Sequence, residues 1–289
     1  MNPSPSLLLV GCGDIGSRLA RLMLAADCTV YGLRRDISQL PAGVLPVACD
    51  LQQALCPPGW PSGQLDYLVY CVAASASGEA GYRAAYVDGL RHVLGWLAQA
   101  GQRPKRLLFV SSTSVYGQRE GEWVDERSAT EPEGFSGRIM LEAEQLLLGS
   151  GLPASVLRLS GIYGPGREFL LNQVRQGYRV ISTPPLYGNR IHADDAAGLL
   201  AFLLHADARG VALDDCYIGV DDAPAALHEV VGWLRDYLGV SQWAAESSVR
   251  RSGSKRCSNA RARALGWTPQ YPSYREGYAA LLAADNRAQ

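Results

Sequence analysis

Short apolar runs alternate with helical patterns over roughly the first 160 residues. The runs are four to seven residues long and rich in Leu and Val. Between several of them, apolar positions recur at helical spacing, at 17–26, 82–100 and 139–148. A regular alternation of strands and helices is typical of a parallel sheet with helices on both faces. We expect strands at 7–10, 29–33, 44–48, 66–72, 106–110 and 155–159.

The regular alternation breaks down beyond residue 160. Helical patterns remain at 169–176, 194–205 and 225–238. A stripe of large apolar residues on the last pattern is typical of core packing or of a dimer contact, so a homodimer is possible. The members of this stripe are Trp233, Leu234, Tyr237 and Leu238.

The first apolar run leads directly into the glycine pattern G-x-G-x-x-G, and an amphipathic run follows it. Strand, glycine turn and helix in this order form the dinucleotide-binding fingerprint. We expect Gly11 to allow a tight turn, Gly13 to let the backbone approach a pyrophosphate, and Gly16 to let the helix pack close to the strand. The N-terminus of the helix, with Asp14 and Ile15, offers N–H groups to the phosphates. The alternative is a glycine turn that only packs helix on strand.

The end of the second predicted strand indicates which cofactor is preferred. A site for NAD(H) usually has Asp or Glu there, about 20 residues after the glycines, to bind the ribose 2′-hydroxyl. This chain has Arg34 and Arg35 instead. Because guanidinium groups bind phosphate and a carboxylate would repel it, we predict NADP(H), with NAD(H) possible. The alternative is that the two arginines cap the strand end and pair with Asp36.

These patterns predict an α/β fold, a Rossmann-type doubly wound parallel sheet with a small C-terminal substrate lobe. We place an NAD(P)-binding Rossmann core at residues 1–160. Residues 161–289 form mainly a substrate-binding lobe, with some segments returning to the core in one continuous structural unit. Ligands of open α/β sheets bind at the carboxyl ends of the strands.

The composition of the chain indicates which kinds of partner it binds and in which cellular compartment it works. The net charge is −1, so nothing favours nucleic acid or an anionic membrane, and a small-molecule substrate is expected. The seven cysteines are odd in number and include no C-x-x-C, which indicates reduced thiols in a cytoplasmic protein and no zinc site. No apolar stretch approaches the roughly 20 residues of a membrane helix. The N-terminus lacks the basic region of a signal peptide.

Six further segments follow one another in the order of one known family. One is V-S-S-T-S-V-Y-G at 110–117, which is similar to that family's signature after the fifth strand. The chain thus resembles the extended short-chain dehydrogenases/reductases, the group that contains NAD(P)-dependent epimerases and dehydratases. The other segments are C-D-L at 49–51, C-V-A-A at 71–74, R-L-S-G-I-Y-G-P-G-R at 158–167, N-R-I-H-A-D-D at 189–195 and the closing stretch 255–267.

The resemblance implies roles for residues in these segments. Ser112 takes the place of the residue that polarises the substrate carbonyl or hydroxyl. Asp50, followed by Leu51, takes the place of the aspartate that meets the adenine amino group. Ala73 and Ala74 take the place of residues that line the cofactor. The expected activity is hydride transfer between NADP(H) and a carbonyl, an alcohol or a sugar-nucleotide-like substrate.

The family's catalytic pair, Tyr-x-x-x-Lys, is absent. Alignment on L-E-A-E-Q-L-L at 141–147 puts Ser136 at the tyrosine position and Met140 at the lysine position. The only lysines are Lys105 and Lys255, and neither has a tyrosine four residues before it. A serine hydroxyl is a poor acid or base near neutral pH unless a neighbour activates it. The family mechanism therefore cannot operate unchanged.

Three interpretations stay open. The first is an oxidoreductase or epimerase with another proton donor, in which Arg138 replaces the lysine's charge and Tyr116, Tyr163 or His192 supplies the proton. The second is a catalytically silent NADP(H)-binding redox sensor or regulatory protein. The third is a structural partner subunit. The candidate catalytic residues are Ser112, Tyr116, Ser136 and Arg138.

The candidate substrate residues are Tyr163, Arg167, Arg190 and His192. The arginines could hold an anionic substrate such as a sugar nucleotide diphosphate, or pair with surface carboxylates. Alternatively, Tyr116 and Tyr163 simply cover turns, and His192 packs against its neighbours or caps a helix. Asp194 or Asp195 is expected to cap the following helix. The acidic loop 120–133 lacks the spacing of a calcium loop, which favours a solvated lid over a metal site.

Overall fold

The computed structural model describes residues 4–244 and 253–288, and these form two compact units. Unit 1 lies within Met1–Val115, Glu131–Arg158 and Ala197–Tyr217. Unit 2 lies within Tyr116–Thr130, Leu159–Ala196 and Ile218–Gln289. The chain therefore passes from one unit to the other five times. The sequence predicts one main boundary at residue 160, with some later segments returning to the core.

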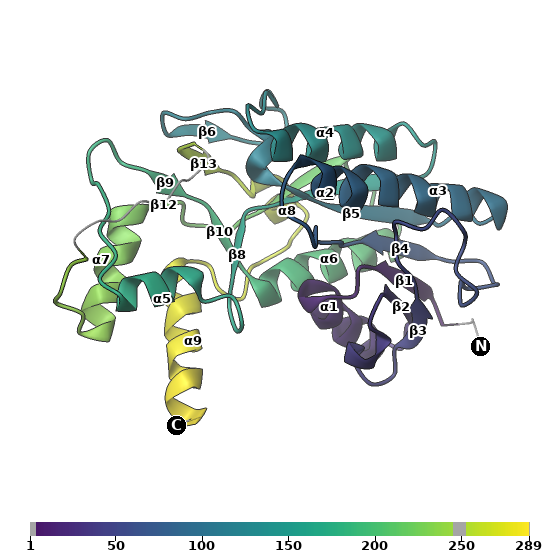
Figure 1. Ribbon diagram of the computed structural model, residues 1–289, viewed down its shortest axis with the longest axis horizontal. Coiled ribbons are helices and arrows are strands. Elements are labelled where there is room, and N and C mark those ends of the chain that lie inside the picture. Colours follow the sequence, from purple (N-terminus) through teal and green to yellow (C-terminus); the bar gives the residue numbers. More distant parts are fainter. Residues whose placement is uncertain (1–3, 245–252, 289) are drawn as a thin grey trace. The chain divides into compact units, whose positions relative to one another are not determined.

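A seven-stranded sheet in the order β11-β7-β5-β4-β1-β2-β3 confirms the predicted Rossmann-type fold (Figure 1). β1 pairs in parallel with β2 on one side and β4 on the other, and β2–β3 and β4–β5 are parallel too. The strand order reverses between β1 and β4, and this is where such sheets bind ligands. The strands are β1 Ser6–Val10, β2 Thr29–Arg34, β3 Leu45–Ala48, β4 Tyr67–Tyr70, β5 Arg106–Ser112, β7 Ala154–Leu159 and β11 Cys216–Gly219.

The strongest predicted strands lie in the middle of the sheet. All four residues of β4 are buried, as are Leu7, Leu8, Leu9 and Val10 of β1. A strand with helices on both faces is apolar on both, which explains why these runs do not alternate with polar residues. The sequence analysis did not predict β11, the seventh strand.

Helices cover both faces of this sheet. Figure 1 shows α3 and α4 on one side of β4 and β5, and α1 and α6 on the other. The predicted helix at 82–100 consists of three segments, with a π-helical turn in the middle. The helical segments are α1 Asp14–Ala25, η1 Ile37–Gln39, α2 Glu79–Arg83, the π-helical η2 Ala84–Asp88, α3 Gly89–Gln99, η3 Thr113–Val115, α4 Phe135–Leu148 and α6 Ala193–Ala208.

The described part of unit 2 is built from short strands and helices. β8 pairs with β10, β12 with β9, and β13 with β6. Strands of two or three residues carry too little periodicity to be predicted from sequence. The elements are β6 Glu122–Val124, β8 Gly161–Tyr163, α5 Phe169–Arg175, β9 Tyr187–Gly188, β10 Arg190–His192, β12 Ala225–Ala226, α7 Leu227–Leu238, β13 Lys255–Cys257, α8 Ala260–Ala264 and α9 Tyr274–Ala288.

The core of unit 2 joins α5, α7 and α9. It contains Leu171, Val230, Leu234 and Leu281, all 3% exposed or less. The members of the predicted stripe on α7 differ in burial. Leu234 lies in this core, Trp233 and Leu238 are partly buried and pack against the core, and Tyr237 is 51% exposed. The stripe is thus mainly core packing.

None of the helices in the described parts of the chain is long and apolar enough to span a membrane.

Candidate active site

The glycine loop of unit 1 has the geometry that its pattern predicts. Gly11 has φ +84°, a conformation that side chains disfavour, and a Cβ there would lie 2.7 Å from the Cys71 carbonyl oxygen at the end of β4. A Cβ on Gly16 would lie 2.9 Å from the Gly11 carbonyl oxygen, which explains the close packing of α1 on the loop. Apart from the neighbours of Gly13 in the chain, no described residue has an atom within 4 Å of its Cβ position, so the backbone is open to a ligand.

The first turn of α1 faces the same opening. Gly13 is the N-cap residue, and no described side chain caps this end of the helix. Its N-terminal N–H groups and the positive end of its dipole therefore suit an anion. Asp14 would repel phosphate, but its carboxylate forms an ion pair with Arg18 at 2.8 Å.

Arg34 and Arg35 differ in what they contact. The Arg34 guanidinium donates to the Cys12 carbonyl at 3.0 Å and so ties the end of β2 to the glycine loop. Arg35 is exposed and makes no hydrogen bond or ion pair within the described residues. Asp36 instead accepts hydrogen bonds from the backbone N–H and hydroxyl of Ser38. Within the described residues Asp36 forms no ion pair with either arginine, so the pairing in the alternative interpretation is not observed, whereas Arg34 does bond to backbone carbonyls near the strand end.

The segments after β3 and β4 contain the other predicted cofactor residues. Asp50 and Leu51 are half-buried; Asp50 accepts from the Gln52 N–H at 3.1 Å, and the Leu51 carbonyl oxygen lies 2.8 Å from His92 Nδ1. Ala73 is exposed, and the Ala74 N–H donates to Tyr86 at 3.4 Å.

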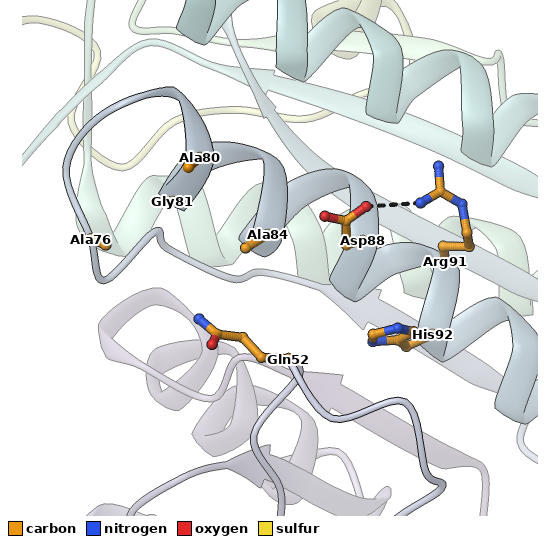
Figure 2. A pocket seen from close by; sticks show the side chains of 8 residues that line it. All are labelled: Gln52, Ala76, Ala80, Gly81, Ala84, Asp88, Arg91 and His92. Atoms are coloured by element: carbon orange, nitrogen blue, oxygen red, sulfur yellow. Dashed lines mark hydrogen bonds and ion pairs between the residues drawn. The ribbon is translucent and has the colours of Figure 1, made fainter.

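A pocket of about 590 Å³ lies beside the segment after β3 (Figure 2). Small residues of α2, of η2 and of the loop before α2 form one wall, and Gln52 lies opposite them. The Asp88–Arg91 ion pair, at 2.8 Å, and the His92 ring form the polar end. The small residues are Ala76, Ala80, Gly81 and Ala84.

Unit 1 brings Ser112 and Ser136 to neighbouring elements. Ser112 ends β5, and its Oγ accepts the Ser114 N–H at 3.1 Å, which leaves its own proton available to a substrate oxygen. Ser136 lies in the first turn of α4. This turn contacts η3 directly, because a Cβ on Gly137 would collide with the Ser114 carbonyl.

The other side chains of α4 differ in their surroundings. Met140, at the family's lysine position, is 4% exposed and packs in the core. Arg138 is exposed and donates to the Glu133 carbonyl. Residues two apart on a helix point to nearly opposite sides, so Arg138 does not share a face with Ser136 and Met140.

A buried ion pair attaches α4 to strands β5 and β7 of the sheet. Glu144 accepts from Arg158 of β7, with Nη2 at 2.7 Å and Nε at 3.0 Å, and from the Ser111 hydroxyl of β5 at 2.5 Å. All three side chains are buried. Because Ser111 precedes Ser112, one carboxylate holds α4 and the end of β5 together.

In unit 2, Tyr116 and the acidic loop form a fixed structure. Tyr116 is 3% exposed, and its hydroxyl donates to the Asp125 carbonyl at 2.9 Å. Its own carbonyl accepts from Lys255 Nζ at 3.0 Å. Glu126 accepts the Ile218 N–H at 2.9 Å, and burial raises the pKa of its carboxyl. The described loop 116–130 is therefore anchored at several points, although Glu120, Glu122 and Asp125 are exposed. Its role as a lid stays a prediction.

The predicted substrate residues lie in different surroundings of unit 2. Arg190 is 5% exposed and Tyr163 is 4% exposed within the core, whereas Arg167 is on the surface. The ring of His192 lies 5.3 Å from that of Tyr163 and 4.1 Å from that of Tyr271. Packing thus accounts for the position of both rings without a ligand, and their contact with substrate stays a prediction.

The start of α6 corrects the expected helix cap. The helix begins at Ala193, so Asp194 and Asp195 lie inside its first turn. His192 Nδ1 accepts the Asp194 N–H at 3.2 Å instead. Asp195 accepts the N–H groups of Gln270, at 2.6 Å, and of Tyr271, at 3.0 Å.

Within the described residues, no group of three or more His, Cys, Asp or Glu side chains could hold a metal ion.

Comparison with known proteins identifies the family. The model of the NAD dependent epimerase/dehydratase family matches residues 7–219. The chain belongs to this family. A solved structure of a NAD-dependent epimerase/dehydratase from Methylobacillus flagellatus is 37% identical, with a TM-score of 0.81 over 99% of this chain and 100% of that one.

More distant proteins are similar to this chain in part of the sequence or in the fold. Protein YeeZ of Escherichia coli K12 is 34% identical over 119 residues, which cover 39% of this chain and 40% of that protein. The match thus spans less than half the length of this curated relative. At 20% identity, MoeE5 in complex with UDP-glucuronic acid and NAD shares the fold, with a TM-score of 0.78 over 99% of this chain and 100% of that one.

Sequence reasoning missed the polar residues that organise the two units. Glu144 lies in an apolar stretch beside Glu142, and no spacing tells which of the two is buried. Asp221, which is 2% exposed in unit 2, is likewise the first of two adjacent aspartates. Gly137 had a usable signal, because a glycine in the first turn of a helix disfavours that helix unless a close approach requires it.

Proposed function

We propose that this protein is an NADP(H)-dependent oxidoreductase that acts by hydride transfer with a non-standard proton donor. The observation that carries the proposal is the glycine loop, open at Gly13, next to a helix N-terminus and an Arg35 that have no side-chain partner among the residues that the structure describes. An NADP(H) pyrophosphate would lie over Gly11–Gly16, and its 2′-phosphate would meet Arg34 and Arg35. Asp50, Leu51, Ala73 and Ala74 would hold the adenosine part.

Bound NADP(H) would supply the hydride, and the chain would supply hydrogen bonds. Ser112 is the best-placed donor to a substrate oxygen, because its Oγ accepts from the Ser114 N–H and keeps its own proton free. Ser136 replaces the family's tyrosine on the neighbouring helix turn. The substrate would carry a carbonyl or an alcohol. A sugar nucleotide is one candidate, since MoeE5 was solved with UDP-glucuronic acid.

The cofactor assignment is tested by titration of the protein with NADPH and NADH, followed by fluorescence. NADPH should bind at least tenfold more tightly, about 1.4 kcal/mol, through the contacts of its 2′-phosphate. Equal binding, or tighter binding of NADH, would overturn the preference. Gly13→Asp should abolish binding of both, because a carboxylate would occupy the space of the pyrophosphate.

The activity is tested with a panel of carbonyl compounds, measured as NADPH consumption. Ser112→Ala should lower kcat by about 10²–10³ if its hydroxyl stabilises the developing charge. Ser114→Ala is the matched control, because it keeps the backbone N–H that Ser112 accepts. A protein that binds NADPH but turns over no member of the panel contradicts the enzymatic assignment.

One observation favours a second candidate, a silent redox sensor. Met140 is buried in the core and can neither hold a ribose nor tune a neighbouring acid. A sensor should bind NADPH and NADP⁺ with different affinities and show no turnover. An enzyme shows turnover that depends on Ser112.

A further inference from the structure

Asp221 lies beside Arg190 in the backbone of unit 2. β8 and β10 run parallel, with Arg190 opposite Gly161. The Asp221 N–H donates to the Arg190 carbonyl at 2.8 Å. The turn that follows β11 therefore continues alongside β10 and places a carboxylate next to a guanidinium.

Both charged groups are buried but do not bond to each other. Arg190 is 5% exposed and Asp221 is 2% exposed. Within the described residues, both terminal nitrogens of Arg190 and one carboxylate oxygen of Asp221 lack a hydrogen-bond partner. The hydroxyl of Tyr163 also lacks one. Buried polar groups are almost always satisfied, so several orphan atoms together indicate a missing partner.

The remaining contacts of the two groups are weak. The Arg190 guanidinium lies 5.5 Å from the centre of the Tyr274 ring on α9. The other Asp221 oxygen accepts the Ala223 N–H at 3.3 Å. Neither contact supplies the strong acceptors that a guanidinium with five donors requires.

Burial makes the protonation of Asp221 sensitive to pH near neutrality. Burial raises the pKa of Asp221 to about 7, against the opposing effects of Arg190 and the Ala223 N–H. Asp222 on the same turn and Asp195 on α6 raise it further. The other titratable groups of this cluster are Tyr163 on β8, His192 on β10 and Tyr278 on α9, which lies 4.5 Å from Tyr163.

We propose that Asp221 is a proton-controlled counter-ion of Arg190 and sets the pH range in which unit 2 holds an anionic ligand. With Asp221 protonated, the guanidinium charge is uncompensated, and its free N–H groups suit an oxyanion such as a phosphate ester or a carboxylate. With Asp221 ionised, its carboxylate neutralises Arg190 and repels the anion. Anion binding therefore takes up one proton. The proposal rests on the proposed role of unit 2 in substrate binding.

The ligand experiment uses UDP-glucose, whose diphosphate charge is constant over the pH range used. Calorimetric titrations of the full chain between about pH 5.5 and 8.5 should show constant affinity below neutrality and a roughly tenfold loss per pH unit above it. Asp221→Asn should bind equally well across the range. Asp222→Asn is the matched control, because it removes a neighbouring charge and should keep the pH dependence. Arg190→Met should abolish binding throughout.

Several outcomes would overturn the proposal: no binding of UDP-glucose at pH 6, a wild-type affinity that does not change with pH, or a parallel change in Asp221→Asn. NADPH binding is measured on the same samples. Binding of NADPH without pH-dependent anion binding refutes the proposed role of Asp221 and leaves the cofactor assignment intact. The reverse result refutes the cofactor assignment alone.

A second measurement needs no ligand. A carboxyl whose pKa is raised on folding weakens the fold as pH rises from its unfolded value to its folded value. Relative to Asp221→Asn, the folding equilibrium constant of the wild type should therefore fall roughly a hundredfold between pH 5 and 8. Parallel stability curves for the two proteins would contradict a proton-controlled Asp221.

Discussion

Arg158 with Glu144 in unit 1, and Arg190 with Asp221 in unit 2, are both arginine–carboxylate couples that are almost completely buried. In unit 1 the two side chains meet at 2.7 Å, and Ser111 adds a third bond. In unit 2 the charge of Arg190 lowers the pKa of Asp221, but the two side chains share no hydrogen bond within the described residues. The first pair is fully hydrogen-bonded and connects structural elements, a closed pair. The second is an open pair, with atoms that can still bind a proton or a ligand.

The lengths and positions of the side chains explain the difference. Glu144 projects from a helix onto strands β5 and β7 and is long enough for a forked contact with Arg158. Asp221 is shorter and sits on a turn, where the Ala223 N–H already occupies one of its oxygens. A buried pair stabilises only where its geometry is good, so the first can serve the fold while the second remains a candidate for function.

Breaking the closed pair should have the largest effect. Glu144→Leu leaves the Arg158 charge and the Ser111 hydroxyl buried without their partner, and should lower the free energy of unfolding by about 3–5 kcal/mol. Urea denaturation followed by tryptophan fluorescence measures this. Asp88→Asn, which breaks the exposed pair with Arg91, should change it by about 0.5 kcal/mol or less. A similar small loss for both variants would show that the buried pair does not connect structural elements.

The same helix is held at its other end by a close contact. Gly137→Ala should lower the free energy of unfolding by about 1–3 kcal/mol, because the new methyl group collides with the Ser114 carbonyl. Gly95→Ala on α3 is the matched control: no atom lies within 4 Å of its Cβ position. That change should be neutral or stabilise by up to about 1 kcal/mol through helix propensity. Equal effects at the two sites would remove the case for tight packing of α4 on η3.

The open pair should respond to pH rather than collapse. Arg190 lowers the pKa of Asp221, so Arg190→Met should raise it further above about 7. The variant should then lose about 1 kcal/mol more stability at pH 8 than at pH 5.5, because only the ionised carboxylate misses the guanidinium. In an Asp221→Asn background the cost of Arg190→Met should not depend on pH. A cost that is equal at both pH values with Asp221 present would contradict coupling between the two residues.

The two units also differ in how well the sequence predicts them. The apolar runs of β1 and β4 and the glycine pattern reflect rules that act over a few residues, so the Rossmann-type sheet and the role of Gly11 follow from them. Unit 2 depends on strands of two or three residues paired across the chain, such as β6 with β13. Such pairs leave almost no periodic signal, because their stability comes from contacts distant in sequence.

The candidate site shows the same division. The contact of Arg34 with the glycine loop joins residues 22 apart, and no pattern encodes it. The surroundings of Tyr163 and Arg190 could not be predicted either, because identical motifs occur at exposed and at buried positions. Asp221 became visible only through its burial and its unpaired oxygen.

A third arginine, Arg35, completes the comparison, because it is unpaired like Arg190 but exposed. Solvent satisfies its charge, so Arg35→Ser should change the free energy of unfolding by only about 0.5 kcal/mol or less. The same variant should weaken NADPH binding about tenfold, near 1.4 kcal/mol, and leave NADH binding unchanged. Arg209→Ser, at another exposed arginine of unit 1, should alter neither. An equal loss for both cofactors would show that Arg35 acts through the shape of the loop and not through the 2′-phosphate.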